Sequence, residues 1–511
     1  MKRSEFVSLP PVARRRFLQV LAGVLAAPAV DSVLRGKAYD AIGVARALPA
    51  NTPSYLLEIN LRDQWDHGHV FVAPSLATLG DLRRGEAGRK CALFFTPDQL
   101  TARANNVFLT PQSLELEPHL EDIALLETCE LSVGAIHGHE SANALRSPGR
   151  SYSSSGGRLP MFNNERPSNF PQGCEEFYST TPTPASLHNY VQKQLEPGIK
   201  NGIAFKGISR SIHTAYHFGA GLPGAELDRV QSKGQLFSSF PSSVEDFNIL
   251  PSAEEADAVT RLLNRVDQRF LRARKYTDAA SDGHLSNLTE NQRLLYAGEP
   301  RVFDLPLTPE EIAAWSAGVP DQAANPSDVK AQIWEQVAFA TKILVNGVSR
   351  TVALEFDYVD VHDQRTEGQM ATMTAQVVLP LRRAIDAFKA AGIWDRTLIA
   401  IYTTDGGRAP AAGSQGNEGK NAALLAGGMI RGGYYGDLGV DGLDGDGHRY
   451  KYAAPNVADG SRGTFVTDNS ARLEGKHVWR TVMSALGVDD GLASSFPDVA
   501  DAQVMSWLLR S

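Results

Sequence analysis

The chain has 511 residues, of which 42% are hydrophobic and 21% are charged. This is the balance of an ordinary globular protein with enough apolar material for a buried core. Its 50 Lys and Arg residues against 58 Asp and Glu residues give a formal net charge of -8, which argues against a nucleic-acid partner because such binding needs a basic surface. Its 3 cysteines show no CxxC spacing, which argues against a disulfide scaffold or a thiolate zinc site.

The N-terminal segment, residues 1–29, predicts export. Residues 14–19 read RRRFLQ, and an apolar run from Val20 to Ala29 follows. The run is shorter than the roughly 20 residues that span a bilayer, and it ends in small residues typical of a cleavage site. The pattern resembles a twin-arginine signal, which predicts that the twin-arginine translocase carries the folded chain to the periplasm or the exterior. The alternative is a basic amphipathic helix at the surface.

The mature chain, from about residue 50 to 511, predicts a single α/β domain. Strand patterns alternate with helix patterns, which favours a largely parallel sheet. No later stretch reaches about 18 apolar residues, so no transmembrane segment is expected in the mature chain. Near-continuous apolar runs are typical of strands covered on both faces. The predicted strands are Tyr55–Leu61, Cys91–Thr96, Leu131–Ile136, Ile203–Ile208, Thr351–Phe356, Thr397–Thr403 and Ala422–Ala426.

Helical patterns fill several intervals between these strands. Ser252 and Glu255 form a capping box, and Pro309 after Thr308 marks another helix start. The expected helices cover residues 252–275, a stretch from 308, 328–344 and 368–391. Because residues 250–345 show helix patterns without strands, we expect a helical insertion there.

Two segments with many turn-forming residues are expected to be long loops. Residues 146–184 are rich in Ser, Gly, Pro and Asn, and residues 436–463 are rich in Asp and Gly. Loops of this length in a compact domain are often functional. We expect the first of them to be a lid over a site or a flexible insertion.

Asp and His residues directly follow three of the predicted strands. In an open parallel sheet, ligands bind beyond the carboxyl ends of the strands, so these residues would meet at one edge. Carboxylate and imidazole groups suit Zn²⁺, Mn²⁺, Ca²⁺ or Mg²⁺. The alternative for each cluster is a solvated loop or a helix cap. The clusters contain Asp63, Asp66, His67 and His69, then Asp357, Asp360, His362 and Asp363, and finally Asp405.

A fourth cluster, IHGHES, follows the strand predicted at 131–136 and contains His137, His139 and Ser141. A helix is expected to begin at Ser141, and backbone N–H groups at a helix start can hold an anion. Ser141 is therefore a candidate nucleophile. The simpler interpretation is that Ser141 caps the helix.

The order of these elements is similar to a known family. The matching elements are RDQWD at 62–66, VDVHDQ at 359–364, FKAAGIWDRTLIAIYTTDGGRAP at 388–410 and ALLAGGMIRGGYYG at 423–436. They resemble the exported family called domain of unknown function fifteen hundred and one, and the middle of the chain resembles its sister family fifteen fifty-two. Both families resemble the alkaline phosphatase and sulfatase superfamily. The resemblance implies an alkaline phosphatase-like three-layer sandwich with Asp360 and His362 as ligands of one metal.

The sequence departs from the family pattern at two places. Asp405 is followed by Gly406, where the superfamily strand carries an Asp-His pair. The family's Gly-Thr-Asp-His element corresponds to residues 416–419, where Glu418 stands in place of Asp and no His is present. The sulfatase signature Cys-x-Pro-x-Arg is absent around all 3 cysteines, which argues against a formylglycine-dependent enzyme.

Two functions follow from the sequence. The first is an exported hydrolase that binds one or two divalent metals and cleaves phosphate or sulfate esters of a small molecule or polysaccharide. Its nucleophile would be Ser141 or a water held by the metal, and its metal ligands would be Asp66, Asp360, His362 and Asp405. The second is a non-catalytic binding or assembly protein of the cell envelope, which keeps the fold with an incomplete metal centre. In that case the 146–184 loop would carry the contacts with a partner.

Overall fold

The structure is a computed structural model. It describes residues 54–62, 65–80, 82, 93–130, 150–151, 187–188, 191, 202–205, 215–216, 227–230, 307–320, 333–347, 349–357, 366–403, 421–444, 447–467, 473–488, 490–494 and 499–510. Several expectations lie wholly or mostly outside these residues: the signal at 1–29, the strand at 131–136, the helix start at Ser141, the loop at 146–184, the helix at 252–275 and the first part of the helical insertion at 250–345. They stay predictions.

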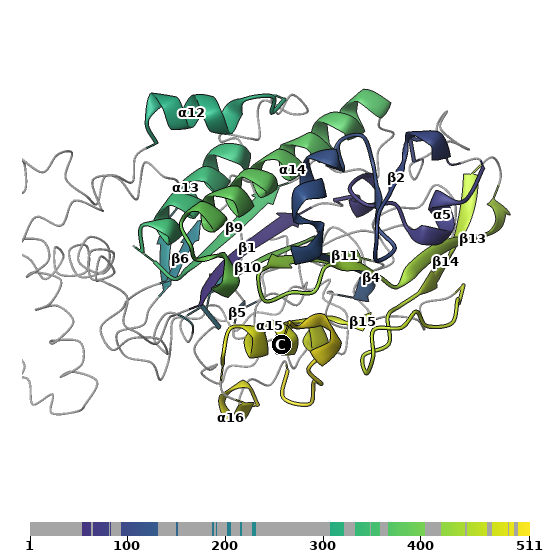
Figure 1. Ribbon diagram of the computed structural model, residues 1–511. Coiled ribbons are helices and arrows are strands. Elements are labelled where there is room, and N and C mark those ends of the chain that lie inside the picture. The colour runs from purple at the N-terminus through teal and green to yellow at the C-terminus, as the bar shows by residue number, and fades with distance from the viewer. Residues whose placement is uncertain are drawn as a thin grey trace, which may run out of the picture.

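A mixed sheet forms the centre of the fold (Figure 1). Its strand order in the described part of the chain is β12-β4-β11-β10-β1-β9-β6-β8, with β15 beside β4. Strand β11 runs antiparallel to both neighbours, and the other pairings in this sheet are parallel. The largely parallel α/β sheet predicted from the sequence is therefore confirmed. The strands are β1 (Tyr55–Arg62), β4 (Ile123–Glu130), β6 (Gly202–Phe205), β8 (Leu227–Val230), β9 (Thr351–Asp357), β10 (Thr397–Thr403), β11 (Asn421–Gly427), β12 (Gly433–Tyr435) and β15 (Leu473–Glu474).

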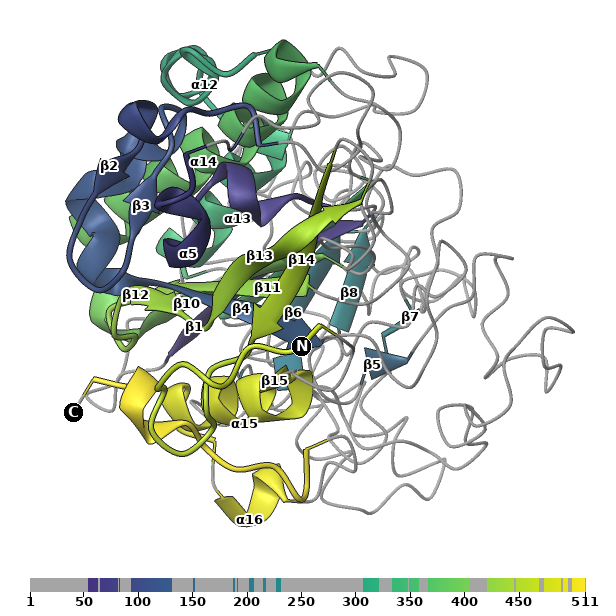
Figure 2. The same ribbon diagram turned by 90° about the vertical axis from the view of Figure 1, so that its right-hand side faces the viewer.

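Helices cover the two faces of the sheet, which gives three layers (Figures 1 and 2). One face carries α13 (Ile333–Val345) and α14 (Glu367–Ala390), and α12 (Pro309–Ser316) lies beside α13. The other face carries α15 (Gly475–Ala485) and α16 (Asp490–Ala493). None of the described helices has the length and apolar character that crossing a bilayer requires.

The two helical layers explain why the strand sequences are apolar at nearly every position. Along β1, Leu57, Ile59 and Leu61 pack into the core that includes α13 and α14. Leu56 belongs to the core on the α15 side, together with Trp479. Successive side chains of a strand point to opposite faces, so a strand buried on both faces needs apolar residues in both registers.

Two predicted elements differ in the structure. Residues 93–96 of the expected strand 91–96 form no strand, although Phe94 and Phe95 are buried. The expected loop at 436–463 contains a hairpin of β13 (Asp437–Asp444) and β14 (Gly447–Ala453). Burial explains both errors, because an apolar run can pack without pairing, and Tyr450 and Tyr452 bring an Asp- and Gly-rich segment into the core.

Short elements complete the described chain. The helix α5 (Pro74–Ala77) contacts β13. The small strand pairs are β2 (Thr101–Ala102) with β3 (Phe108–Leu109), and β5 (Arg150–Ser151) with β7 (Ala215–Tyr216). The 3-10 helices are η1 (His67–His69), η2 (Pro97–Gln99), η3 (Ser113–Asp122), η6 (Trp394–Arg396) and η7 (Ser506–Leu508).

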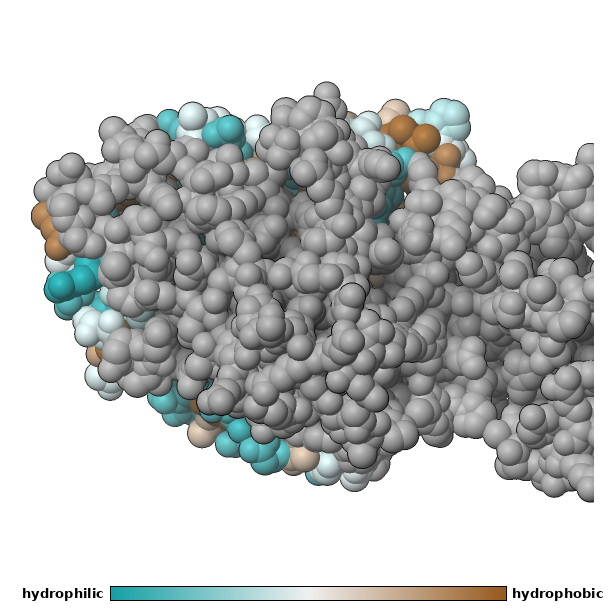
Figure 3. All heavy atoms as spheres, turned by 180° about the vertical axis from the view of Figure 1, so that it is seen from behind, coloured by the Kyte–Doolittle hydropathy of each residue, from teal (hydrophilic) through white to brown (hydrophobic). Residues whose placement is uncertain are grey.

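The described surface carries no broad apolar patch. Seen from behind, its hydrophobic and hydrophilic residues are interspersed along the rim of the molecule (Figure 3). The exposed large apolar side chains are Leu114, Ile312 and Leu443, which lie on three separate elements. Single exposed apolar residues are normal for a globular protein.

The start of β4 is held by the carboxylate of Asp122. It accepts a hydrogen bond from Trp394 Nε1 at 2.8 Å and forms ion pairs with Lys389 Nζ at 2.8 Å and Arg510 at 2.7 Å. Burial alone would raise the pKa of Asp122, but these hydrogen bonds and positive charges lower it below its ordinary value of 3.8. Because the pKa is lower in the folded chain, the ionised carboxylate stabilises the fold above pH 3.8, and this contribution is lost as the pH falls through the folded pKa.

We expect Asp122→Asn to reduce the free energy of unfolding by about 1 kcal/mol at neutral pH, because it removes the charge partner of Lys389 and Arg510, whose own side chains are partly exposed to solvent. The difference from the wild type should shrink at a pH well below 3.8, as the wild-type carboxylate gains its proton. Denaturant unfolding at both pH values measures this. A difference that is the same at both would contradict the role of the carboxylate charge.

Candidate functional site

The three strands that precede the Asp and His clusters are neighbours in the sheet. Strand β1 pairs in parallel with β10 on one side and with β9 on the other. Leu61 lies opposite Thr403, and Arg62 lies opposite Asp357, so the carboxyl ends of the strands are level. The expectation that these three strands end at one edge of the sheet is confirmed.

Of the predicted site residues, Asp66 is described and Asp360, His362, Asp405 and Ser141 lie outside the described residues. The described residues contain no group of three or more His, Cys, Asp or Glu side chains arranged to hold a metal. That Asp360, His362 and Asp405 meet Asp66 at this edge therefore stays a prediction.

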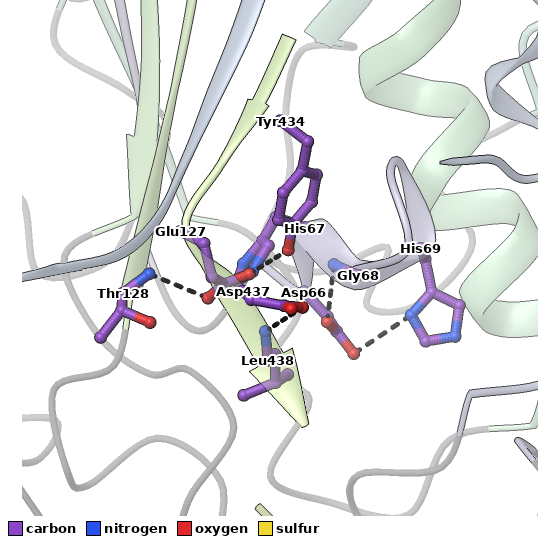
Figure 4. Close-up of polar contacts among 9 residues, drawn as sticks. All are labelled: Asp66, His67, Gly68, His69, Glu127, Thr128, Tyr434, Asp437 and Leu438. Atoms are coloured by element: carbon purple, nitrogen blue, oxygen red, sulfur yellow. Dashed lines mark hydrogen bonds and ion pairs between the residues drawn. The ribbon is translucent and has the colours of Figure 1, made fainter. Parts of the chain in front are cut away.

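Asp66 lies at the start of the turn that follows β1 (Figure 4). It caps η1 by accepting a hydrogen bond from the backbone N–H of Gly68 at 3.0 Å. Its other carboxylate oxygen lies 3.1 Å from His69 Nδ1. Only 8% of Asp66 is exposed. These contacts fix the carboxylate close to the edge of the sheet, as a cap with a buried polar partner.

His69 is held by the same carboxylate. When its Nδ1–H donates to Asp66, the lone pair of the neutral ring lies on Nε2. Nε2 is buried and has no hydrogen-bond partner in the described part of the chain. The ring lies 5.2 Å from the Phe95 ring and 6.0 Å from the Phe94 ring, measured between centroids. The turn thus carries a carboxylate–imidazole pair with one unpaired ring nitrogen in an apolar setting.

A second buried pair, which the sequence analysis did not identify, lies beside the first (Figure 4). Glu127 of β4 accepts hydrogen bonds from His67 Nε2 at 2.8 Å, from the Tyr434 hydroxyl and from the backbone N–H of Thr128 at 2.9 Å. Burial alone would raise the pKa of Glu127, but the charge of His67 and the three hydrogen bonds hold it below its ordinary value. Glu127 is therefore a buried carboxyl group surrounded by hydrogen-bond donors from three residues.

The backbone at Glu127 is irregular. The pairing of β4 with β11 shifts between the pairs Asn421–Cys129 and Ala423–Leu126, which marks a bulge. Thr128 adopts a φ of 55°, a left-handed conformation that costs a β-branched residue of order 1–3 kcal/mol. Bulges re-aim side chains and are frequent beside functional sites. The sequence signal was a single Glu inside an apolar run, which did not reveal its partners.

The neighbouring Asp437, also drawn in Figure 4, has a structural role. Its carboxylate accepts hydrogen bonds from the backbone N–H of Ser75 at 3.0 Å and the Ser75 hydroxyl at 2.7 Å. It also pairs with Arg462 at 2.9 Å. These contacts join the β13–β14 hairpin to α5.

The comparisons with known proteins give a family match without an assigned activity. Residues 228–448, fewer than half of the chain, match the family described as "Protein of unknown function (DUF1501)". This agrees with the resemblance seen in the sequence, whereas the sister family and the signal peptide stay predictions. The comparison with curated proteins gave no match.

Two solved structures are distantly similar to the chain. The PsFucS1 sulfatase from Pseudoalteromonas sp. has 12% identity and a TM-score of 0.34, over 98% of this chain and 78% of that one. The lipoteichoic acid synthase LtaP from Listeria monocytogenes has 9% identity and a TM-score of 0.32, over 91% of this chain and 98% of that one. At these scores neither likeness carries an argument about fold or activity.

Proposed function

We propose that the protein is an exported, metal-dependent hydrolase of phosphate or sulfate esters. The observation that carries the proposal is the level ending of β10, β1 and β9 at one edge of the sheet. Each of these strands is followed by Asp or His residues. A crevice beyond the carboxyl ends of parallel strands is where open α/β sheets bind their ligands.

Covalent geometry allows the predicted ligands to meet there. An extended chain spans about 3.3–3.6 Å per residue, so Asp405 is limited to about 7 Å from the end of β10 and Asp360 to about 11 Å from the end of β9. Neighbouring strands lie about 4.7–4.9 Å apart. Asp66 is held in the turn after β1 by its capping hydrogen bond. The ends of three strands therefore limit these carboxylates to a small volume.

The contacts of Asp66 fit a metal ligand. Ligating carboxylates are themselves hydrogen-bonded by outer groups that orient them, and Asp66 accepts from Gly68 and lies against His69. We propose that a divalent cation is held by Asp66, Asp360, His362 and Asp405. Bound there, it would supply Lewis-acid polarisation of the ester and stabilise the charge that develops on its oxygens. Ser141 is the proposed nucleophile.

Metal content of the exported wild-type protein, purified without chelators, tests the proposal. Plasma mass spectrometry should find at least one tightly held divalent ion per chain. A screen of aryl phosphates and aryl sulfates should then reveal turnover that a chelator removes and added metal restores. A folded protein that holds no metal and refuses Zn²⁺, Mn²⁺, Ca²⁺ and Mg²⁺ would contradict it.

A second candidate rests on the residues that replace the expected histidines. Gly406 stands where the superfamily pattern has the His of an Asp-His pair, and residues 416–419, with Glu418 in place of Asp, lack the family's His. A centre with fewer ligands would favour a binding or assembly protein of the cell envelope. Capture of a stable envelope partner, with no turnover of any ester in the same screen, would select this candidate.

A further inference from the structure

The turn that carries Asp66 is held at two points, by Glu127 of β4 and by Thr110, which follows β3. At its start, His67 is bound by Glu127 through Nε2 at 2.8 Å. At its end, the backbone carbonyl of His69 accepts a hydrogen bond from the Thr110 hydroxyl at 2.8 Å. The turn is closed by the N–H of Val70, which donates to the carbonyl of His67 at 2.8 Å. A rotation of the turn would have to break one of these contacts.

The contacts of Glu127 include two energetically unfavourable features, a buried carboxylate and a strained backbone conformation. A buried ion pair is weak evidence for stability, since well-packed apolar residues often replace one without loss. Glu127 is nonetheless almost fully buried, with a relative exposure of 2%. The residue that donates its N–H to it, Thr128, occupies the strained φ of 55°. Strained backbone persists where the surrounding structure holds it in place, and it clusters at functional sites.

We propose that Glu127 is a positioning residue that fixes His67 and thereby orients the Asp66 carboxylate toward the metal site. This inference rests on the proposed function for its effect on metal binding. The connection is short: Asp66 and His67 are adjacent, and Asp66 caps the same turn that the His67 ring anchors. Tyr434, from β12, donates to the same carboxylate oxygen as His67 and so limits where that oxygen can lie.

The chain contains a matched control for this arrangement. Glu58, in the middle of β1, is fully buried, lies 2.5 Å from His188 Nε2 and accepts a hydrogen bond from the Tyr402 hydroxyl. The group around Glu58 and the group around Glu127 therefore consist of the same three residue types, Glu, His and Tyr. Glu58 alternates with Leu57 and so points to the α15 side of the sheet, where Tyr402 packs. Its partners His188 and Tyr402 lie outside the turn, so a purely structural loss can be separated from a loss of positioning.

The experiment compares Glu127→Gln with Glu58→Gln in the full chain. Calorimetric titration with Zn²⁺ or Mn²⁺ should show affinity weakened by about 10–100-fold in Glu127→Gln, the usual effect of losing a group that orients a ligand. Glu58→Gln should lower thermal stability yet keep the wild-type affinity. Equal affinities for the wild type and Glu127→Gln would overturn the inference.

A second measurement does not depend on metal. Amide hydrogen exchange at Gly68 and Val70, whose N–H groups hold the turn together, should be at least about tenfold faster in Glu127→Gln and unchanged in Glu58→Gln. If the wild type binds no metal, the proposed function fails and this exchange still decides the positioning role. Should Glu127→Gln not fold, Tyr434→Phe, which keeps the ion pair, should show a smaller acceleration. Exchange rates at Gly68 and Val70 that equal those of the wild type in every folded variant would overturn the inference.

Discussion

Replacing Asp360 and His362 together with alanine is expected to abolish tight binding of divalent metal while leaving the fold intact. The two residues would supply half of the proposed ligand set, the half that follows β9. Losing even an outer group that orients a ligand costs about 10–100-fold in metal affinity, so losing two ligands should cost about 1,000-fold or more. Calorimetric titration and plasma mass spectrometry measure the affinity and the residual metal.

The control for this prediction is the neighbouring acidic residue Asp363. It lies in the same VDVHDQ element but is not among the proposed ligands. Asp363→Asn should keep wild-type metal content, and denaturant unfolding of both variants should match the wild type without metal. Full metal occupancy in the double variant would show that the ligand assignment is wrong, whatever the activity of the protein.

Replacing Trp479 with alanine is expected to cause the largest loss of stability, about 3–5 kcal/mol in the free energy of unfolding. Trp479 belongs to α15 and is only 1% exposed. Its ring meets the Tyr402 ring edge to face, with centroids 5.7 Å apart. Removing it leaves a cavity between α15 and the sheet that the surrounding side chains fill only in part.

Trp315, on α12, provides the comparison. It is partly buried at the surface of the other helical layer, and α12 contains no buried residue. Trp315→Ala should therefore cost no more than about 1.5 kcal/mol. Denaturant unfolding of the two variants under the same conditions measures both values. A similar loss in the two variants would contradict the view that the α15 layer is part of the core.

The strands around the site were predictable because their sequences are governed by local patterns. The apolar runs at 55–61, 351–356 and 397–403 correspond to β1, β9 and β10 within one residue. Burial on both faces selects such runs, and the rule for parallel sheets placed their carboxyl ends at one edge. The Asp and His residues follow these strands directly in the sequence. The edge could therefore be identified as a candidate site from the sequence alone.

The buried pair at Glu127 was not predictable, because its partners are distant in sequence. Glu127 is 60 residues from His67 and 307 residues from Tyr434. From the sequence alone, a glutamate inside an apolar run indicates an exposed strand position or an irregularity in the strand. The hairpin of β13 and β14 was missed for a related reason, since its Asp- and Gly-rich segment resembles a loop until the burial of its tyrosines is seen.

The sequence by itself determined the α/β class, the strands at the site and the acidic character of their ends, because strand burial and strand-end chemistry are encoded in short, contiguous patterns. Only the tertiary structure decided which strands are neighbours and that Glu127 holds His67. These features depend on contacts between residues far apart in the chain. The folded core alone brings them together, and its low-dielectric interior makes an ionised carboxylate stable only where such partners surround it.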